Sequence, residues 1–495
     1  MRSQALASLL ALSLVLGGCG GGSSGNSTSS TPTPTPTPTP TGTADTCSLA
    51  NRKAWALAQL QEWYLFPDLL DTTVNPSYYS TLQDYIDALV APARAASQDR
   101  YFTYVTSIAE EDAYYASGET AGFGVRLGFD YSSVRLFVIE SYETAPGYAA
   151  GMDRGTEIVA IGTSTSNLQT VSSLYASGGV SAVNNALGPS TVGTTRVFQI
   201  RQPDSRLLTI SVTKQDFELE PLSSRYGSKV ITNNGRKVGY VNLRTFVNTA
   251  DPALRQAFAN FRAQGITEVI VDLRYNGGGL ISIADVFSNL MNAGRTGQVM
   301  NYTTFRDSKS YYNETAYFTT EAEAIAATRI AFIGTGSTAS ASELVMNAQK
   351  PYLPAGIALV GANTYGKPVG QIGLDNTACD DRLRLVALKV QNADREGDYY
   401  TGLASTYPAT CQASDDIFYQ LGDVNEPSIR AALGFLNGNS CSAIGSSMTA
   451  TATASAPGDA LSEPTAVAAA RSRAARQPLE ADKPNFAQRE LPGLF

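Results

Sequence analysis

The sequence predicts an α/β protein, built as a chain of several α+β domains. Apolar runs of strand length, at 330–333 and 357–360, alternate with segments of helical periodicity in the second half of the chain. Several short strands separated by glycine-rich turns follow one another between residues 116 and 216. A chain of 495 residues is long enough for two or three domains with cores of their own.

The composition excludes some classes of partner and site. The formal net charge is −8 and the chain has no sustained basic run, so nucleic acid is not expected as a partner. The chain contains no histidine, which excludes a Ser-His-Asp triad and any histidine-bound metal. The sequence implies no metal and no cofactor.

The first residues have the features of an export signal. The apolar run at 5–16 is too short to span a bilayer but has the length of a signal-peptide core. It leads into the letters LGGC, ending at Cys19, which resemble the bacterial lipobox, where the cysteine is lipidated. An ordinary signal peptide with an unrelated cysteine is the alternative. We expect a lipoprotein signal at 1–19, and Gly20 in place of aspartate implies anchoring in the outer membrane of the cell envelope, facing the periplasm.

Two segments of different character follow the signal. Residues 20–46 are dominated by Gly, Ser, Thr and Pro, which predicts a disordered, extended linker that holds the folded part away from the membrane. From residue 47, apolar residues recur at helical spacing in two stretches, which end at Pro67 and Pro92. This pattern predicts a small helical domain at 47–115.

A glycine-containing loop, a short helix and regularly spaced strands follow at 116–216. Residues 145–152 are APGYAAGM and residues 155–161 are GTEIVAI. This order resembles a PDZ domain, with a helix at 180–187 beside the peptide groove. PDZ domains bind peptide C-termini by strand addition and hold the carboxylate with backbone N–H groups. The residues expected to bind the peptide are Gly122, Phe123, Gly124 and Val125. A glycine-kinked hairpin without a ligand is the alternative.

Ser342 and Lys367 are the candidate catalytic pair. The strand at 330–333 leads through a Gly- and Ser-rich turn into a helix that begins close to Ser342, and the strand at 357–360 leads into the loop of Lys367. A helix N-terminus offers unpaired N–H groups and a positive dipole end. A serine hydroxyl needs a base, and lysine is the remaining common one. Lys367 must be neutral to act, which requires burial that lowers its pKa from about 10.4.

The sequence motifs around this pair resemble those of a known family. SASE at 340–343, then YGK ending at Lys367, then Gln371, resemble the carboxy-terminal processing peptidases, also called tail-specific proteases. In that family the matching positions are the nucleophile (Ser342), the general base (Lys367) and a glutamine that orients the lysine (Gln371). The resemblance also implies two oxyanion donors, which are backbone N–H groups at Gly278, in the stretch DLRYNGGG, and at Glu343.

The same resemblance implies a fold and a reaction. The family core is a crotonase-like mixed sheet, here expected at 217–440 with the PDZ-like domain inserted before it. The expected function is a serine endopeptidase that hydrolyses exported proteins through an acyl-enzyme. Its partners would be protein or peptide substrates with accessible C-termini, and the oligomeric state is left open. Pro368 departs from the family, where glycine is more frequent; proline fixes φ in this loop.

The cysteines beyond Cys19 predict disulfides, because they are even in number in an exported chain. They are Cys47, Cys379, Cys411 and Cys441. Of the three possible pairings we favour Cys379–Cys411 as a local link and Cys47–Cys441 as a link between the two ends. Residues 441–495 are rich in Ser, Thr, Ala and Pro, which predicts a disordered tail.

Rival interpretations remain open at this stage. An inactive core with a working PDZ-like domain would make the chain a peptide-binding lipoprotein. A lipase or esterase could use the same Ser-Lys pair on acyl esters. Ser342 as an ordinary helix residue and Lys367 as an exposed loop charge would leave no active site. The Ser-x-x-Lys pattern at 211–214 lies in a strand-like segment without companion motifs, and we interpret it as chance.

Overall fold

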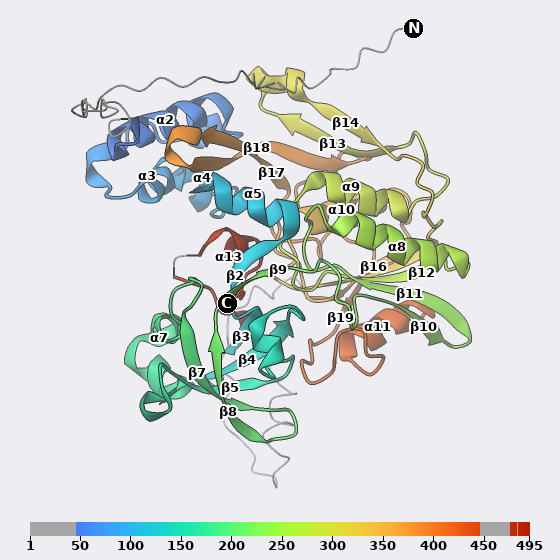
Figure 1. The fold of residues 1–495 in the computed structure, drawn as a ribbon. Helices are drawn as coiled ribbons and strands as arrows, with labels where there is room; N and C mark the ends of the chain where they lie inside the picture. Colours follow the sequence, from blue (N-terminus) through green and yellow to red (C-terminus); the bar gives the residue numbers. More distant parts are fainter. Residues whose placement is uncertain (1–45, 446–475, 483) are drawn as a thin grey trace, which may run out of the picture. The chain divides into compact units, whose positions relative to one another are not determined.

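The computed structural model describes residues 46–445, 476–482 and 484–495, which belong to one unit of the chain. The predicted signal peptide, Cys19 and nearly all of the predicted linker lie outside these residues. These described residues have the predicted α/β class, with four sheets and helices packed against them (Figure 1). No helix in the described residues is both long and apolar enough to cross a bilayer.

A six-stranded sheet forms the centre of the region predicted to be catalytic. Its order is β10-β11-β12-β15-β16-β19, and every neighbouring pair except β10 and β11 runs parallel. The predicted strands at 330–333 and 357–360 are confirmed as β15 and β16. The strand bounds are β10 Ser228–Asn233, β11 Arg236–Asn242, β12 Glu268–Asp272, β15 Arg329–Gly334, β16 Ile357–Gly361 and β19 Thr410–Gln412.

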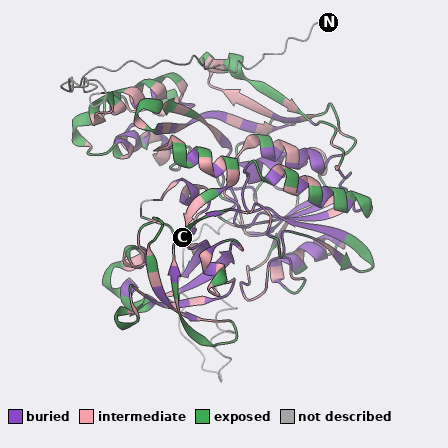
Figure 2. Cartoon of the chain, viewed as in Figure 1, coloured by how far each residue is buried: buried purple, intermediate pink, exposed green. Residues whose placement is uncertain are grey.

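Helices cover both faces of this sheet. Side chains of successive strand residues point to opposite faces, so Val269 and Val271 of β12 enter one core while Ile270 enters the other. Because both faces are covered, the central strands β12, β15 and β16 are mostly apolar and appear buried in Figure 2. The first core contains α8 Ala250–Ala263, α9 Ile281–Leu290 and α10 Ala341–Gln349, and the second contains α11 Pro427–Leu436.

A second sheet joins the N-terminal helices to the catalytic region. Its order is β1-β18-β13-β14, with β17 also paired to β18. The strand β1 lies in the predicted helical domain at 47–115, yet Tyr104 pairs opposite Arg384 of β18. The N-terminal helices therefore share a core with β17 and β18. The bounds are α2 Leu49–Trp63, α3 Leu82–Leu89, α4 Ala91–Ala95, β1 Tyr104–Ser107, α5 Ile108–Ser117, β13 Val299–Phe305, β14 Glu314–Tyr317, β17 Val369–Asn376 and β18 Asp381–Asn392.

The strands of the PDZ-like region form a separate seven-stranded sheet. Its order is β20-β3-β4-β5-β7-β8, with β6 paired to β5, and α7 packs on its apolar face. The helix predicted at 180–187 is the second half of α7, which bends at Gly178 and Gly179. A two-stranded ribbon, β2 Glu119–Gly122 with β9 Gln215–Glu218, closes the region. The other bounds are β20 Gln477–Pro478, β3 Val125–Asp130, β4 Arg135–Ser141, α6 Pro146–Ala149, β5 Glu157–Gly162, β6 Gln169–Thr170, α7 Val171–Leu187, β7 Thr195–Arg201 and β8 Leu207–Thr213.

The predicted disulfide pairing is wrong, although all four cysteines are bonded. Cys47 pairs with Cys379 and Cys411 pairs with Cys441, with Cα–Cα distances of 5.4 and 4.8 Å. The first pair meets because α2 lies beside the start of β18, where Arg52 forms an ion pair with Asp381. The second pair meets because α11 packs on β19 and returns the chain to it, so neither contact is local in sequence.

Non-reducing peptide mapping is expected to recover Cys47 joined to Cys379 and Cys411 joined to Cys441. Opening the first link frees a loop of more than 300 residues in the unfolded chain, so Cys47→Ala is expected to lower the free energy of unfolding by about 2–4 kcal/mol. Urea unfolding with and without reductant measures this difference. A peptide joining Cys379 to Cys411 would contradict the pairing.

The prediction of a disordered tail is wrong for residues 476–482 and 484–495. Gln477–Pro478 form β20, which pairs with β3, and Phe486–Glu490 form α13. Average composition predicted disorder, but a few apolar side chains in this segment bury themselves against the folded chain. These buried residues are Leu479, Phe486, Leu491, Leu494 and Phe495.

Candidate active site

The turn between β15 and α10 places Ser342. The strand β15 ends at Gly334, and Thr338 Oγ1 then donates a hydrogen bond of 2.7 Å to the carbonyl of Leu273, which ties the turn to the end of β12. Ser342 lies in the first turn of α10, as predicted. Its side chain is buried, and Oγ donates a 3.0 Å hydrogen bond to the carbonyl of Asn276.

The backbone bends sharply just before Ser342. Ser340 has a φ of 55°, which residues other than glycine rarely adopt, and it caps α10. Its side chain accepts the N–H of Glu343, while its own N–H donates to the Glu343 carboxylate at 3.1 Å, which forms a capping box. A Cβ added at Gly278 would lie 2.7 Å from the Cβ of Ser340, so this bend requires a glycine opposite it.

The Lys367 side chain is half-buried beside Phe102. Its Nζ donates a 2.6 Å hydrogen bond to Oε1 of Gln371 and lies 5.1 Å from the centre of the Phe102 ring. Gln371 is fixed in turn because its Nε2 donates to the carbonyl of Phe102. Burial lowers the pKa of Lys367, against an opposing contribution from Glu490. A lowered pKa is the property that a lysine base requires.

The Glu343 carboxylate joins the helix of Ser342 to the loop of Lys367. It accepts hydrogen bonds from Thr364 Oγ1 at 2.6 Å and from the N–H groups of Gly366 and Lys367, both at 2.7 Å. Burial raises the pKa of Glu343, and these hydrogen bonds oppose that rise. Sequence reasoning assigned a role only to its backbone N–H; the Ser-x-x-Glu spacing of a capping box at 340–343 is the signal that would have drawn attention to its side chain.

Both predicted oxyanion donors have partners within the chain. The N–H of Gly278 donates to Oδ1 of Asn276 at 2.9 Å. The N–H of Glu343 donates to the side chain of Ser340 in the capping box. The two groups lie on segments that touch each other, since Gly278 packs against the turn of Ser340.

The Ser-Lys pair is likewise not joined in this structure. The hydroxyl of Ser342 points to the carbonyl of Asn276 and the ammonium of Lys367 points to Gln371. Among the described residues, no hydrogen bond links Ser342 Oγ to Lys367 Nζ. The structure therefore places the predicted groups on adjoining segments, and each group is hydrogen-bonded to another residue of the chain.

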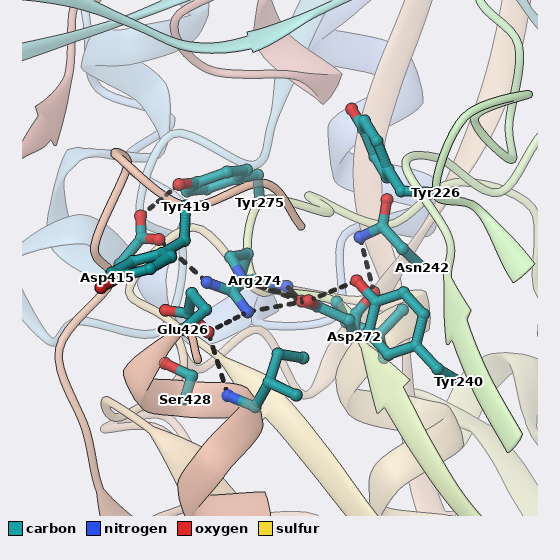
Figure 3. A network of polar contacts seen from close by, with 12 residues as sticks. Tyr226, Tyr240, Asn242, Asp272, Arg274, Tyr275, Asp415, Tyr419, Glu426 and Ser428 are labelled. Atoms are coloured by element: carbon teal, nitrogen blue, oxygen red, sulfur yellow. Dashed lines mark hydrogen bonds and ion pairs between the residues drawn. The ribbon is translucent and has the colours of Figure 1, made fainter. Parts of the chain in front are cut away.

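A buried charge network anchors the loop that carries Gly278. Arg274 is fully buried and pairs with Asp272 at 2.9 Å, Asp415 at 2.9 Å and Glu426 at 3.1 Å (Figure 3). The Tyr240 hydroxyl donates to Asp272 at 2.9 Å. Figure 3 shows Arg274 at the centre, with the three carboxylates around its guanidinium group. Sequence analysis quoted Arg274 only within the glycine-rich motif and missed this anchoring role.

The predicted peptide-binding loop lies at the start of β3. It consists of Gly122, Phe123, Gly124 and Val125. A Cβ on Gly124 would lie 1.9 Å from the Cβ of Ala145, and φ of Gly124 is 69°, so this position requires glycine. The segment at 493–495 pairs with this loop and with the first residues of β3.

A cavity of about 1300 Å³ lies beside the candidate base Lys367 and the loop of Gly277. Gly277, Ala339 and Lys367 line it from the catalytic region, and residues from 476–494 line it from the opposite end of the chain. The cavity therefore connects the candidate base with the C-terminal segment.

Part of the chain matches a known protein family. Residues 237–396 match the model of "Peptidase family S41". A chloroplastic carboxyl-terminal-processing peptidase 2 from Arabidopsis thaliana is 29% identical over 264 residues, which are 50% of this chain and 46% of that protein. A carboxyl-terminal-processing protease from Picosynechococcus sp. is 28% identical over 254 residues, 51% of this chain and 55% of that protein. The chain thus spans about half the length of these curated relatives.

The fold has a counterpart among solved structures. A putative S41 protease from Bacteroides fragilis superposes with a TM-score of 0.60 at 22% identity, over 78% of this chain and 97% of the other. This likeness concerns the arrangement of sheets and helices. The family match and the two carboxyl-terminal-processing relatives confirm the resemblance that the motifs around Ser342 and Lys367 carry.

Proposed function

We propose that this chain, whose residues 237–396 match peptidase family S41, is a serine-type endopeptidase. Ser342 is the nucleophile, Lys367 the general base and Gln371 the residue that orients the base. The observation that carries the proposal is the environment of Lys367: burial lowers its pKa, and Gln371 accepts its hydrogen bond at 2.6 Å. Glu343 ties the Lys367 loop to the helix of the nucleophile.

The proposed reaction is acyl transfer through an ester on Ser342. The Ser342 hydroxyl leaves the carbonyl of Asn276, gives its proton to neutral Lys367 and attacks the peptide carbonyl carbon. The N–H groups of Gly278 and Glu343 bind the oxyanion. Protonated Lys367 then gives its proton to the leaving amine as the C–N bond breaks. Water, deprotonated by Lys367, hydrolyses the ester and restores the serine.

This reaction requires three hydrogen bonds to be exchanged. They are the bond from Ser342 Oγ to Asn276, the bond from the Gly278 N–H to Asn276 and the bond from the Glu343 N–H to Ser340. A typical exchange of this kind changes the free energy by about 0.5–1.5 kcal/mol per bond. Substrate binding can therefore supply the free energy that assembles the site.

The seven-stranded region is proposed to present substrate C-termini. The loop from Gly122 to Val125 and the edge of β3 offer the backbone groups that strand addition uses. The helix α7 lies over the same core and provides the apolar wall of the groove. In this proposal the region acts as a PDZ-type peptide-binding domain that delivers chains to Ser342.

The location of the protein is also a proposal. The apolar run at 5–16 followed by Cys19 supports a lipid anchor in the outer membrane, with the folded chain facing the periplasm. The two disulfides support it as well, because disulfides persist in oxidising compartments. Metabolic labelling with a palmitate analogue tests the anchor, and Cys19→Ala is the control.

The test of the function compares the parent chain with Lys367→Met on an unfolded protein substrate, with mass spectrometry of the products. Cleavage by the parent alone is expected, because methionine fills a similar volume but cannot take a proton. Equal cleavage by both chains would contradict the assignment of the base. Cleavage of ester substrates without cleavage of peptides would replace the peptidase by an esterase.

A peptide-binding protein without activity is the second candidate. It is favoured by the partners that occupy both proposed oxyanion donors, and by the hydrogen bonds that Ser342 and Lys367 make to Asn276 and Gln371 and not to each other among the described residues. In that case both chains would bind peptides and neither would cleave them under any condition in which the peptides are bound. The same mass spectrometry distinguishes the two functions.

The rate of cleavage is expected to rise with pH and then level off, as Lys367 loses its proton. The midpoint of this rise is expected below pH 10.5, because burial lowers the pKa of Lys367. Arg384 also lowers this pKa, whereas Glu490, Asp99 and Glu343 raise it. Phe102→Ala is expected to move the midpoint to higher pH, since water would then solvate the ammonium form. Phe318→Ala, which removes a buried ring elsewhere, is the control and leaves the midpoint in place. An unchanged midpoint in Phe102→Ala would contradict burial as the cause.

A further inference from the structure

The edge of β3 is occupied by residues from the far end of the chain. The N–H of Phe495 donates to the carbonyl of Val125 at 3.0 Å, and the N–H of Val125 donates back to Phe495 at 3.3 Å. The N–H of Leu127 donates to the carbonyl of Gly493 at 2.7 Å. This alternation is an antiparallel strand pairing, and it uses the backbone groups that strand addition of a substrate requires.

The Phe495 side chain fills the apolar pocket behind this edge. It is 5% exposed and belongs to the same core as Phe123 and, on α7, Val183 and Leu187. A Cβ added at Gly122 would lie 2.9 Å from the carbonyl carbon of Phe495, so the glycine loop closes directly on that residue. The loop predicted to bind peptides therefore has an occupant from this chain.

A separate stretch, residues 477–480, extends the pairing. The N–H of Leu479 donates to the carbonyl of Leu127 at 3.0 Å, and Gln477 pairs opposite Phe129 at the other end of β3. Asn184 of α7 donates to the carbonyl of Glu480 at 2.7 Å. Residues 477–480 and 493–495 together cover β3 from Val125 to Phe129.

Glu490, which precedes the residues paired with β3, contacts the loop that carries Gly277 and Gly278. The carbonyl oxygen of Glu490 would lie 2.1 Å from a Cβ at Gly277, so the two backbones are in contact next to Gly278. Glu490 and Lys367 line the same cavity. Phe486 packs on Tyr114, with ring centres 5.1 Å apart, which fixes α13 in this position.

We propose that residues 484–495 are an internal competitor of the substrate. They occupy the peptide groove through Phe495, and through Glu490 they contact the oxyanion loop at Gly277 and line the cavity that Lys367 also lines, so cleavage requires their release. The groove accordingly selects peptides with a bulky apolar residue at the position that Phe495 occupies. This inference rests on the proposed function for its consequence on catalysis, while occupation of the groove is independent of it.

The binding test uses the Ser342→Ala chain and a labelled synthetic peptide with the sequence of residues 484–495. Phe495→Asp in the chain places a charge in the apolar pocket and expels the segment. The peptide is expected to bind Ser342→Ala/Phe495→Asp about tenfold or more tightly than Ser342→Ala, because apparent affinity falls with the fraction of free grooves. Fluorescence anisotropy measures this. A labelled peptide with aspartate in place of its last phenylalanine is expected not to bind.

A second variant guards against misfolding, since Phe495→Asp alters a buried position. A chain that stops at residue 483 removes the segment entirely and is expected to bind the labelled peptide as tightly as the Phe495→Asp chain. Phe198→Ala is the matched control, because Phe198 is buried in the same core and packs on Phe123 but lies on β7 and takes no part in the strand pairing with 493–495. Equal peptide affinity in all chains, or equal gain in Phe198→Ala, would overturn the proposal.

The catalytic test repeats these comparisons in chains that retain Ser342. Phe495→Asp is expected to raise the rate of cleavage of an unfolded protein by about tenfold or more, in line with the fraction of open sites, and Phe198→Ala is not. An unchanged rate in a Phe495→Asp chain that binds the peptide more tightly would overturn the competitor role. Tighter binding with no cleavage by any chain would support occupation of the groove and contradict the proposed peptidase function instead.

Discussion

Replacing Ser342 with alanine is expected to lower the rate of peptide-bond cleavage by about 10⁴-fold or more, the scale seen when a serine peptidase loses its nucleophile. Ser342 lies in the first turn of α10, and its Oγ reaches the carbonyl of Asn276 in the loop that carries Gly278. The rate is measured with an unfolded protein substrate by quantifying new N-termini. Ser337→Ala is the matched control, because Ser337 lies in the same turn and has no part in the proposed reaction.

Two further variants test whether Ser342 acts with Lys367. Residues that act as one unit give losses that do not add, so Ser342→Ala/Lys367→Met is expected to be no slower than Ser342→Ala alone. Melting curves of all variants establish that each chain is folded. A loss in Ser337→Ala as large as that in Ser342→Ala, or additive losses in the double variant, would contradict the pair.

The sequence was informative wherever local pattern and burial agree. The strands β15 and β16 are buried on both faces, so each is a continuous apolar run between turns and could be located within one or two residues. Because these strands are parallel neighbours, the segments that follow them leave the same edge of the sheet. Ser342 and Lys367 follow those two strands, so both lie near the same edge of the sheet. This is why residues that are far apart in the sequence motif lie on adjoining segments of the fold.

The features that sequence analysis missed depend on contacts between distant residues. The link between Cys47 and Cys379 follows from the packing of α2 beside β18, and cysteine counting cannot choose among pairings. The carboxylate of Glu343 acquires its role only when the loop of Gly366 folds over α10. The segment at 484–495 belongs to a tail whose average composition predicts disorder, although the segment itself contains several large apolar residues. Phe495 is buried because the core of the seven-stranded region receives it.

Replacing Arg274 with methionine is expected to lower the free energy of unfolding by about 3–5 kcal/mol, the usual cost of removing one partner from a buried ion pair. Methionine keeps most of the side-chain volume, so the decrease in the free energy of unfolding reports the missing ion pairs and not a change in packing. Asp272 and Glu426 are both buried and would then lack their counterion. Urea unfolding at neutral pH measures the change.

Arg255 provides a matched control for this variant. It also pairs with three carboxylates, namely Asp251, Glu321 and Glu323, but its side chain is 30% exposed. Exposed ion pairs contribute about 0–1 kcal/mol, so Arg255→Met is expected to change stability little. A similar small loss in both variants would contradict the importance of burial.

The response to acid gives an independent measure of the same network. Burial raises the pKa of Asp415, but the guanidinium groups of Arg154 and Arg274 outweigh it and hold this pKa well below its usual range. A depressed folded pKa contributes stability above the unfolded value of about 3.9, and that stability is lost as the pH falls through the folded pKa. Arg274→Met removes one of the two guanidinium groups, so the folded pKa of Asp415 rises toward the unfolded value. The stability that this carboxylate loses in acid is then smaller, and the loss is complete at a higher pH.

The network also connects stability with catalysis. Arg274 begins the loop that carries Gly277 and Gly278, and its ion pairs fix the start of that loop at the end of β12. A folded Arg274→Met chain is therefore expected to show a large decrease in kcat and only a small increase in KM. The reason is that a displaced Gly278 N–H weakens binding of the oxyanion in the transition state, but not binding of the substrate in the ground state. Steady-state kinetics below the melting temperature of the variant separate the two effects. A change confined to KM would assign Arg274 to substrate binding rather than to the position of the oxyanion loop.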